Sequence, residues 1–261
     1  MSQSDTIDTT DAPELDATIT SDRLREVIGS ISHLVDEARF HFDPDALRVR
    51  FTDPANVGMV HLELSVEAFE SYESSGGAIG INIKRIEDFF ECVGESADIQ
   101  IETVRGEKKY RLTSGPFSLE EEYITPGTVR KDPDEPDLDL LAEFEISTSE
   151  FSQMVECHQT TGRNVGIRLR YHPDKGLVTT SEGDTSTAEY TIPNGILSRI
   201  QERGEAESLF SKDYLNDLVE ALPEGQSMKM GLGDEHPMKM KYTISEGKGT
   251  VLYFQAPRIT S

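Results

Sequence analysis

The stretch TPGTVRKDPDEPDLDLL, residues 125–141, determines how the rest of the sequence is organised. It contains prolines at positions 126, 133 and 136, and five acidic residues between positions 132 and 139. Proline fixes the backbone angle φ and lacks an N–H donor, so this spacing leaves no room for a helix or a central strand. We therefore predict an extended connector over 125–141, which divides the chain into two halves.

The first half, residues 14–124, alternates between strand patterns and two helix patterns. Apolar residues at positions 15, 17 and 19 predict a strand, and Ser21 is suited to be the N-cap of a helix that follows. Apolar residues at positions 24, 27, 28, 31 and 34 form one face of that helix. A second helix is expected over about 84–93. Further strands are expected over 38–42, 47–51, 57–64, 79–83, 99–104, 109–113 and 117–124.

The second half, residues 142–261, repeats this order of elements. Helices are expected over 149–161 and about 211–222. Strands are expected over 143–146, 165–171, 176–180, 188–192, up to 210, and over 227–232, 238–244 and 249–254. Two helices and many short strands in each half predict an α+β fold of two similar helix-backed antiparallel-sheet domains, over 14–124 and 142–261. Residues 1–13 are polar and acidic and are expected to form a disordered tail.

The composition restricts the class of protein. The formal net charge is −24, and the acidic residues are spread along the chain, which favours a surface adapted to high salt over one acidic face for a basic partner. The longest apolar runs are far shorter than a membrane span, and the first residues lack the apolar core of a signal peptide, so a cytoplasmic protein is expected. Cys92 and Cys157 form no CxxC pair and are predicted to be buried small residues.

Motifs for catalysis are lacking in the sequence. It contains no GxxxxGKS/T or GxGxxG loop and no HExxH pair, and its six histidines are not at metal-ligand spacing. His158 could act as a general base, but a packing or surface role is the more common one for a single histidine. The acidic residues of the connector leave an acid-rich metal-dependent hydrolase as an alternative, although a proline-broken segment is a poor platform for metal ligands. The sequence predicts no enzyme, no metal and no cofactor.

Several segments, taken in order, resemble one family. DPANVGMV at 53–60, continued by LELS at 62–65 and FESY at 69–72, resembles the loop and strand of archaeal proliferating cell nuclear antigen (PCNA). PDLDL at 136–140 is similar to the end of the interdomain connector of that family. SLFSKDYL at 208–215 is similar to the entry of a helix in its second domain, and APRI at 256–259 to its C-terminal motif. The chain most resembles haloarchaeal members, which agrees with its charge.

This resemblance implies the DNA clamp fold and a non-enzymatic sliding clamp for DNA replication and repair, associated with the nucleoid. Three subunits would close head to tail into a homotrimeric ring around duplex DNA, with weak, sequence-independent phosphate contacts. The alternative is an accessory or checkpoint-type clamp subunit in a hetero-ring, which the extension before residue 14 motivates. The expected DNA-binding residues at the helix starts and exits are Arg23, Arg25, Lys84, Arg85, His158, Arg163 and Lys212. Acidic residues such as Glu26 and Glu156 interrupt them, and each cation alone could be an ordinary solvated charge.

The resemblance also implies a pocket for short peptide motifs of DNA polymerase, clamp loader, nuclease and ligase. Its expected residues are Thr52, Val57, Met59, Pro133, Glu135, Leu138, Pro237, Phe254, Ala256 and Pro257. Met59 and Phe254 could instead be plain core residues. Thr52 and Glu135 stand where the family commonly has apolar residues, so the choice of partner is expected to differ.

Overall fold

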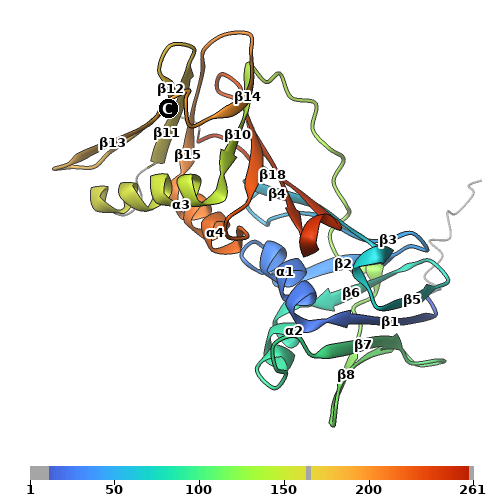
Figure 1. Cartoon of the computed structure of the whole chain (residues 1–261). Coiled ribbons are helices and arrows are strands. Elements are labelled where there is room, and N and C mark those ends of the chain that lie inside the picture. Colours follow the sequence, from blue (N-terminus) through green and yellow to red (C-terminus); the bar gives the residue numbers. More distant parts are fainter. Residues whose placement is uncertain (1–11, 163–165, 259–261) are drawn as a thin grey trace, which may run out of the picture.

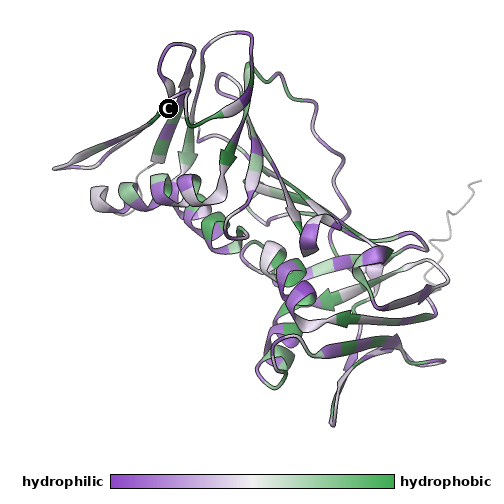
Figure 2. Ribbon diagram, in the orientation of Figure 1, coloured by the Kyte–Doolittle hydropathy of each residue, from purple (hydrophilic) through white to green (hydrophobic). Residues whose placement is uncertain are grey.

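The computed structural model describes residues 12–162 and 166–258. Within these residues the chain forms four α-helices and eighteen strands, arranged in three antiparallel sheets. Hydrophobic and hydrophilic residues alternate along the strands and around the helices (Figure 2), which is the pattern of elements with one buried face. The predicted α+β class is confirmed.

The elements of the first half follow the predicted order. They are β1 (Leu15–Thr20), α1 (Ser21–Ser32), β2 (Glu37–Phe42), β3 (Ala46–Thr52), β4 (Gly58–Ser65), the 3-10 helix η1 (Val66–Ala68), β5 (Ser71–Ser74), β6 (Ala78–Asn82), α2 (Ile83–Phe90), β7 (Asp98–Thr103), β8 (Lys109–Ser114), β9 (Phe117–Glu122) and η2 (Pro126–Thr128).

The second half begins with the strand after the connector. Its elements are β10 (Ala142–Ser147), α3 (Thr148–Cys157), η3 (His158–Thr161), β11 (Gly166–His172), β12 (Gly176–Glu182), β13 (Thr187–Ile192), β14 (Ser198–Glu202), β15 (Ala206–Ser211), α4 (Lys212–Ala221), β16 (Ser227–Leu232), β17 (Met238–Ile244), η4 (Ser245–Gly247) and β18 (Gly249–Gln255).

One sheet is shared by both halves. A five-stranded sheet, β5-β1-β7-β8-β9, belongs to the first half, and a four-stranded sheet, β13-β12-β11-β15, to the second. Between them lies a nine-stranded sheet in the order β14-β10-β16-β17-β18-β4-β3-β2-β6 (Figure 1). Strand β18 pairs with β4 over the whole length from Gly249↔Leu64 to Gln255↔Gly58, which makes the sheet continuous across the two halves.

One face of the junction between β18 and β4 is part of the core. Val60 opposite Tyr253 and Leu62 opposite Val251 are buried and face the core. Gly249 is required at the end of the junction, because a Cβ there would lie 2.5 Å from Ile244 Cγ1. The buried apolar residues of both halves form one continuous cluster, so the halves are joined by a common core as well as by strand pairing.

The four helices lie on one side of the molecule, in the order α3, α4, α1, α2 (Figure 1). In α1 the buried apolar residues Leu24, Val27, Ile28 and Ile31 recur every three or four positions and form one face. The N-cap of α1 is Thr20 and not Ser21, as the sequence had suggested. Ser21 is the first helical residue, and its hydroxyl donates to the carbonyl of Gly94 at 2.9 Å.

A buried carboxylate ties the loop after β3 to α4. The Asp53 side chain accepts hydrogen bonds from the N–H groups of Ala55, Val57 and Gly58 at 2.7–2.9 Å. It also accepts one from the Tyr214 hydroxyl at 2.7 Å, across 161 positions of sequence. Burial by itself would raise the pKa of Asp53, but these hydrogen bonds outweigh it and lower that pKa. Asp53 therefore holds its charge and links the two halves.

The connector between η2 and β10 runs on the side of the sheet away from the helices (Figure 1). Polar contacts hold it along its length. Arg39 donates to the carbonyl of Pro126 at 2.7 Å, His41 Nε2 lies 2.6 Å from an oxygen of Asp132, and Arg203 lies 2.5 Å from Asp139. Apart from η2, it contains no helix or strand before Ala142. The domain limits around it stay a prediction.

Two details differ from expectation. Strands β5 and β14 were not predicted, because neither has a buried position to create an alternating pattern. Cys92 and Cys157 are exposed, so their predicted burial was wrong; they lie just beyond α2 and at the end of α3. Residues 1–11 of the tail predicted over 1–13, and the start of the strand at Val165, lie outside the described residues. In the described part of the chain, no helix has the length and apolar character to cross a membrane.

We predict that Tyr214→Phe lowers the free energy of unfolding by about 1.5–3 kcal/mol, because it removes a hydrogen bond to a charged group. Denaturant unfolding at neutral pH measures this loss. The stabilisation is complete above about pH 4, the ordinary range of an unfolded Asp, and disappears as the pH falls through the lowered pKa of Asp53. Tyr190→Phe is the control, since the Tyr190 hydroxyl donates to Glu150 within the second half. A loss below about 0.5 kcal/mol for Tyr214→Phe would contradict the role of Asp53 as a link.

Candidate functional site

The helix side of the molecule is the first candidate surface. Lys84 and Arg85, at the start of α2, are exposed as expected. Arg85 lies 3.6 Å from Asp88 and 3.5 Å from Glu121, whereas Lys84 forms no ion pair within the described residues. Among the expected DNA-binding residues that the structure describes, Lys84 is therefore the most available to an external anion.

Arg25 has a structural role in this chain. Its guanidinium donates to the carbonyls of Phe90 at 2.6 Å and Val93 at 3.1 Å, and it lies 4.3 Å from the centre of the Phe90 ring. A cation at these carbonyls satisfies the free acceptors at the C-terminus of α2 and its dipole. One terminal nitrogen of this guanidinium is therefore engaged inside the subunit.

Arg23 is similarly occupied. It donates to the carbonyl of Ala68 at 2.8 Å and pairs with Glu70 and Glu246, each at 3.1 Å. Glu246 belongs to η4, so Arg23 connects α1 of the first half to the turn between β17 and β18 of the second half. This contact supports the junction between the halves.

The structure corrects two of the expected DNA-binding residues. His158 is fully buried, and its ring nitrogens lie 2.7 Å from the hydroxyls of Ser181 and Thr179. Lys212 is only 3% exposed, and its ammonium donates to the carbonyls of His158 and Gly162. Both side chains satisfy polar groups at the end of α3 and η3, and neither reaches the surface. Burial, and then the nearby Lys212, lower the pKa of His158. Arg163 lies outside the described residues.

The exposed positions of the helices are mostly acidic. Against Lys84 and Arg85 stand the following exposed carboxylates on the described helices: Asp22, Glu26, Glu87, Asp88, Glu156, Asp213 and Glu220. On α4, burial and the neighbouring carboxylates of Glu220 and Asp213 raise the pKa of Asp217. This surface therefore has little direct attraction for phosphate groups at low salt.

The second candidate surface lies on the other face of the nine-stranded sheet. The register places Thr52 opposite Met59, Met59 opposite Phe254 and Phe254 opposite Lys239, so four strands contribute one row of side chains. The Lys239 ammonium lies 5.6 Å from the centre of the Phe254 ring and 2.6 Å from a carboxylate oxygen of Glu135. The structure thus brings together four of the predicted pocket residues, Thr52, Met59, Phe254 and Glu135, through strand pairing and the connector.

The remaining pocket residues surround the end of this row. The N–H of Ala256 donates to the carbonyl of Val57 at 2.8 Å, which fixes the chain after β18 beside the loop before β4. Pro257 lines a neighbouring cavity of about 220 Å³ together with Leu209 and Ser208. Pro237 directly precedes Met238, which pairs with Gln255. Pro133 and Leu138, in the connector, are half-buried.

Phe254 itself is only 3% exposed and serves mainly as a core residue, while Met59, Val57, Ala256 and Pro257 are half-buried. Lys239 was missed by sequence reasoning, because the pairing of β17 with β18 and β4 does not appear in the alternation of any single strand. Together these residues form an apolar strip beside a charged connector, which suits an apolar anchor of a peptide. In the described parts of the chain, no group of three or more His, Cys, Asp or Glu could hold a metal ion.

The chain is similar to known proteins over almost its whole length. The family model described as "Proliferating cell nuclear antigen, N-terminal domain" matches residues 15–113. The DNA polymerase sliding clamp of Halobacterium salinarum is 37% identical over 245 residues, which cover 94% of this chain and 98% of that protein. The clamp of Methanocella arvoryzae is 31% identical over the same lengths. Among solved structures, the PCNA of A. fulgidus bound to the C-terminal region of FEN-1 superposes with a TM-score of 0.87 at 27% identity, covering 95% and 99% of the two chains.

We predict that Lys212→Ala lowers the free energy of unfolding by about 1–3 kcal/mol, because it leaves buried carbonyl groups without a donor. Lys84→Ala removes an exposed lysine at the start of another helix and is expected to change stability by less than about 0.5 kcal/mol. Denaturant unfolding of the two variants gives the comparison. A Lys212→Ala variant as stable as Lys84→Ala would mean that Lys212 is available at the surface after all.

Proposed function

Since this chain belongs to the PCNA family of DNA polymerase sliding clamps, we propose that three copies close into a ring that encircles duplex DNA and tethers replication and repair enzymes. The observation that carries this proposal is the continuous sheet. Because β18 pairs with β4, the two halves are held at a fixed angle, and unpaired strand edges are left at both ends of the subunit. In this proposal each half is one clamp domain, and 125–141 is the connector between them.

The ends of the subunit suit head-to-tail assembly. At one end β9 forms an edge of the five-stranded sheet, and Phe117 of β9 stacks on Phe89 of α2 with ring centres 5.2 Å apart. At the other end β13 forms an edge of the four-stranded sheet, and Tyr190 of β13 donates to Glu150 of α3. Figure 1 shows these two ends far apart, with α3 and β13 at one and α2, β7 and β8 at the other. Pairing β9 of one subunit with β13 of the next would satisfy both edges and continue the row of helices.

In such a ring the helices line the hole, and the connector lies on the outside. The acidic helix surface implies that the protein holds DNA by topology, while screening cations at high salt remove the repulsion between carboxylates and phosphates. Few direct phosphate contacts give a weak dependence of DNA retention on salt. This property allows a clamp to slide and still remain on DNA.

The apolar strip beside the connector is the proposed docking groove for partner enzymes. A related clamp of the same fold was solved with the C-terminal region of FEN-1, a precedent for peptide binding in this family. Met59, Val57 and Pro257 supply half-buried apolar surface, and Glu135, held by Lys239, supplies charge at its border. DNA polymerase, clamp loader and ligase are proposed to use the same groove. An accessory subunit of a hetero-ring is the alternative, and it predicts that the chain alone forms no trimer.

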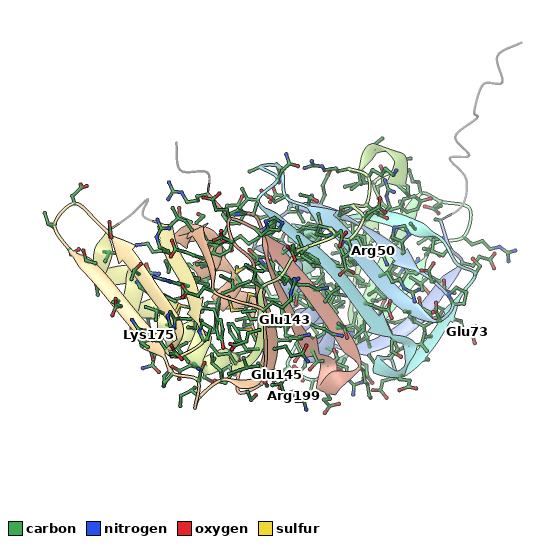
Figure 3. The ribbon with its side chains drawn as sticks, turned by 90° about the horizontal axis from the view of Figure 1, so that it is seen from above. Arg50, Glu73, Glu143, Glu145, Lys175 and Arg199 are labelled. Atoms are coloured by element: carbon green, nitrogen blue, oxygen red, sulfur yellow. The ribbon has the colours of Figure 1, made fainter. Side chains whose placement is uncertain are left out.

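We expect the protein, once loaded by the host clamp loader, to stay on nicked circular DNA and to leave when the DNA is cut once to a linear form. Retention on the circle should change little between low and molar salt. Lys84→Glu should reduce loading, whereas Lys175→Glu should not, because Lys175 is an exposed cation in the turn between β11 and β12, away from the helices (Figure 3). Gel filtration of the DNA complexes measures retention. Equal retention on circular and linear DNA would refute encirclement.

We also expect Met59→Ala and Pro257→Ala each to weaken binding of the FEN-1 C-terminal peptide by about fivefold or more, because truncating an apolar anchor costs over about 1 kcal/mol. Glu145→Ala is the control, since Glu145 lies on β10, farther along the same sheet (Figure 3), and pairs with Arg199. Calorimetric titration measures the affinity, and light scattering confirms an unchanged trimer. Unchanged affinity in both groove variants would place the peptide elsewhere.

A further inference from the structure

A second row of side chains crosses the outer face of the shared sheet, next to the docking groove. The register places Arg50 of β3 opposite His61 of β4, His61 opposite Leu252 of β18, and Leu252 opposite Lys241 of β17. Residues in register on adjacent antiparallel strands project from the same face. This row therefore lies two residues along the strands from Thr52, Met59 and Phe254, and is separate from them.

The row forms the floor of a pocket of about 290 Å³, and the connector residue Glu135 contributes to its wall. Arg48, Glu63 and Thr250 close the pocket at the other side. Figure 3 shows Arg50 on this face of the sheet. All of these residues belong to one subunit, so the pocket does not depend on ring closure.

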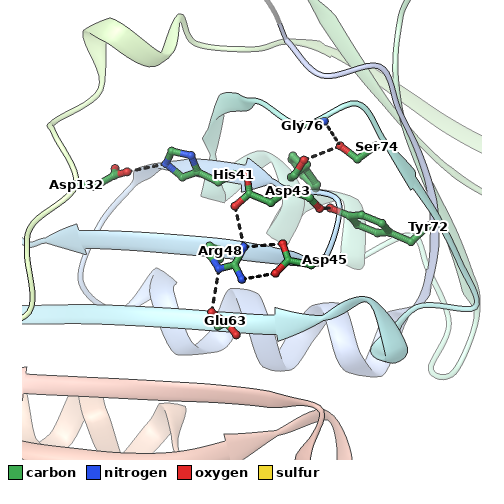
Figure 4. A network of polar contacts seen from close by, with 10 residues as sticks. His41, Asp43, Asp45, Arg48, Glu63, Tyr72, Ser74, Gly76 and Asp132 are labelled. Atoms are coloured by element: carbon green, nitrogen blue, oxygen red, sulfur yellow. Dashed lines mark hydrogen bonds and ion pairs between the residues drawn. The ribbon is translucent and has the colours of Figure 1, made fainter.

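Two cations in the pocket have no carboxylate partner among the described residues. Arg48 is fully engaged, because its guanidinium lies 2.8–2.9 Å from oxygens of Asp43, Asp45 and Glu63 (Figure 4). Glu135 is engaged by Lys239 at 2.6 Å. Arg50 and Lys241 are exposed, and neither forms an ion pair with any of the residues that the structure describes. In a chain with a net charge of −24, two cations in one pocket without an ion pair to any described residue stand out.

In this row His61 lies between Arg50 and Lys241, and it has a buried ring nitrogen that is not hydrogen-bonded to any described residue. His61 is only 8% exposed, its Nε2 atom has no hydrogen-bond partner within 12–162 or 166–258, and its ring lies 5.9 Å from that of Phe254. Burial, and then the neighbouring Arg50, lower the pKa of His61, against opposing contributions from Glu135, Asp132 and Asp134. The imidazole is therefore neutral near pH 7, and a negative charge in the pocket would favour its protonation.

We propose that this pocket binds a single oxyanion between Arg50 and Lys241, above the ring of His61. A guanidinium presents paired donors that match carboxylate, sulfate and phosphate oxygens, and a lysine adds a flexible second charge. The anion would replace the missing carboxylate partner of both cations. Its source is either a free oxyanion of the solvent or a carboxylate carried by an acidic peptide segment, and the two share the same chemistry.

Inorganic sulfate is the first probe, because its charge is constant between pH 5.5 and 8, about the range over which histidine titrates. The full-length protein is titrated with sodium sulfate at constant ionic strength set by sodium chloride. The His61 ring resonances, assigned by their absence from His61→Gln, report binding by NMR. A hexaglutamate peptide is the second probe in the same experiment.

We expect saturable shifts of the His61 resonances, and about tenfold weaker binding in Arg50→Gln and in Lys241→Gln, because each loses a charged donor. Lys229→Gln is the matched control, since Lys229 lies on the same sheet but already pairs with Glu143. Saturation by sulfate identifies a free oxyanion as the source, and saturation by hexaglutamate alone identifies an acidic segment. Failure of both probes to shift His61, or equal binding in Arg50→Gln and Lys229→Gln, would overturn the proposal.

The pH dependence provides an independent check. Because a bound anion raises the pKa of His61, affinity for sulfate should increase as the pH falls from 8 to 5.5, and His61→Gln should bind without this increase. The charged and titratable groups that face His61 are Arg48, Arg50, Glu63, Asp132, Asp134, Glu135, Lys239 and Lys241. Hydrogen bonds to Asp45, Asp43 and Glu63 raise the pKa of Arg48, and the hydrogen bond from Lys239 lowers the pKa of Glu135. His41→Gln serves as a second control, because His41 lies next to Asp132. An affinity that does not change with pH would exclude His61 from the site. The test is independent of DNA and of partner peptides, so its failure leaves the clamp function untouched.

Discussion

The pairing of β18 with β4 is the interaction on which the rest of the structure depends. It joins strands that lie almost 190 positions apart in the sequence, and it turns the sheets of two halves into one. Main-chain hydrogen bonds along both strands fix the register, and a one-residue slip would move Val60, Leu62 and Tyr253 from the core to the surface. The angle between the halves, the row of helices and the positions of the two free edges all follow from this one register.

Cationic and acidic side chains occupy different places on the helices of this protein. Several cations near the helices, Arg23, Arg25 and Lys212, are used inside the subunit, where they satisfy carbonyls and carboxylates. The exposed helix positions are then left mainly to acidic residues. Such a surface would make few lasting contacts with DNA, which agrees with the proposed ring that holds DNA by enclosure. The outer face of the shared sheet keeps positive charge, and it is there that the connector and the proposed partners lie.

The sequence predicted the local features of this fold well. The helical spacing of Leu24, Val27, Ile28 and Ile31 predicted α1, and the prolines at 126, 133 and 136 predicted the connector. The shared sheet was not predictable, because the pattern of a strand shows which face is buried but not which strand is its neighbour. Lys212 and His158 were assigned to the surface for a related reason: a charged residue at a helix start suggests exposure, and only tertiary packing shows that it caps another element. Part of the expected pocket was predicted from the sequence, because Thr52, Met59 and Phe254 do lie in register on adjacent strands. Lys239 was missed, because nothing in the sequence around it shows that it lies opposite Phe254.

The free cysteines offer the most direct test of head-to-tail closure. Cys92 follows α2 at one end of the row of helices, and Cys157 ends α3 at the other, so they lie far apart in one subunit but would approach across each joint of the ring. Treatment of the protein at high salt with a short bis-maleimide, followed by a denaturing gel, should give covalent dimers and trimers for the natural chain. Cys92→Ser and Cys157→Ser should each give only monomers. A natural chain that stays monomeric under these conditions, or crosslinks that persist in both single-cysteine variants, would contradict the ring described above.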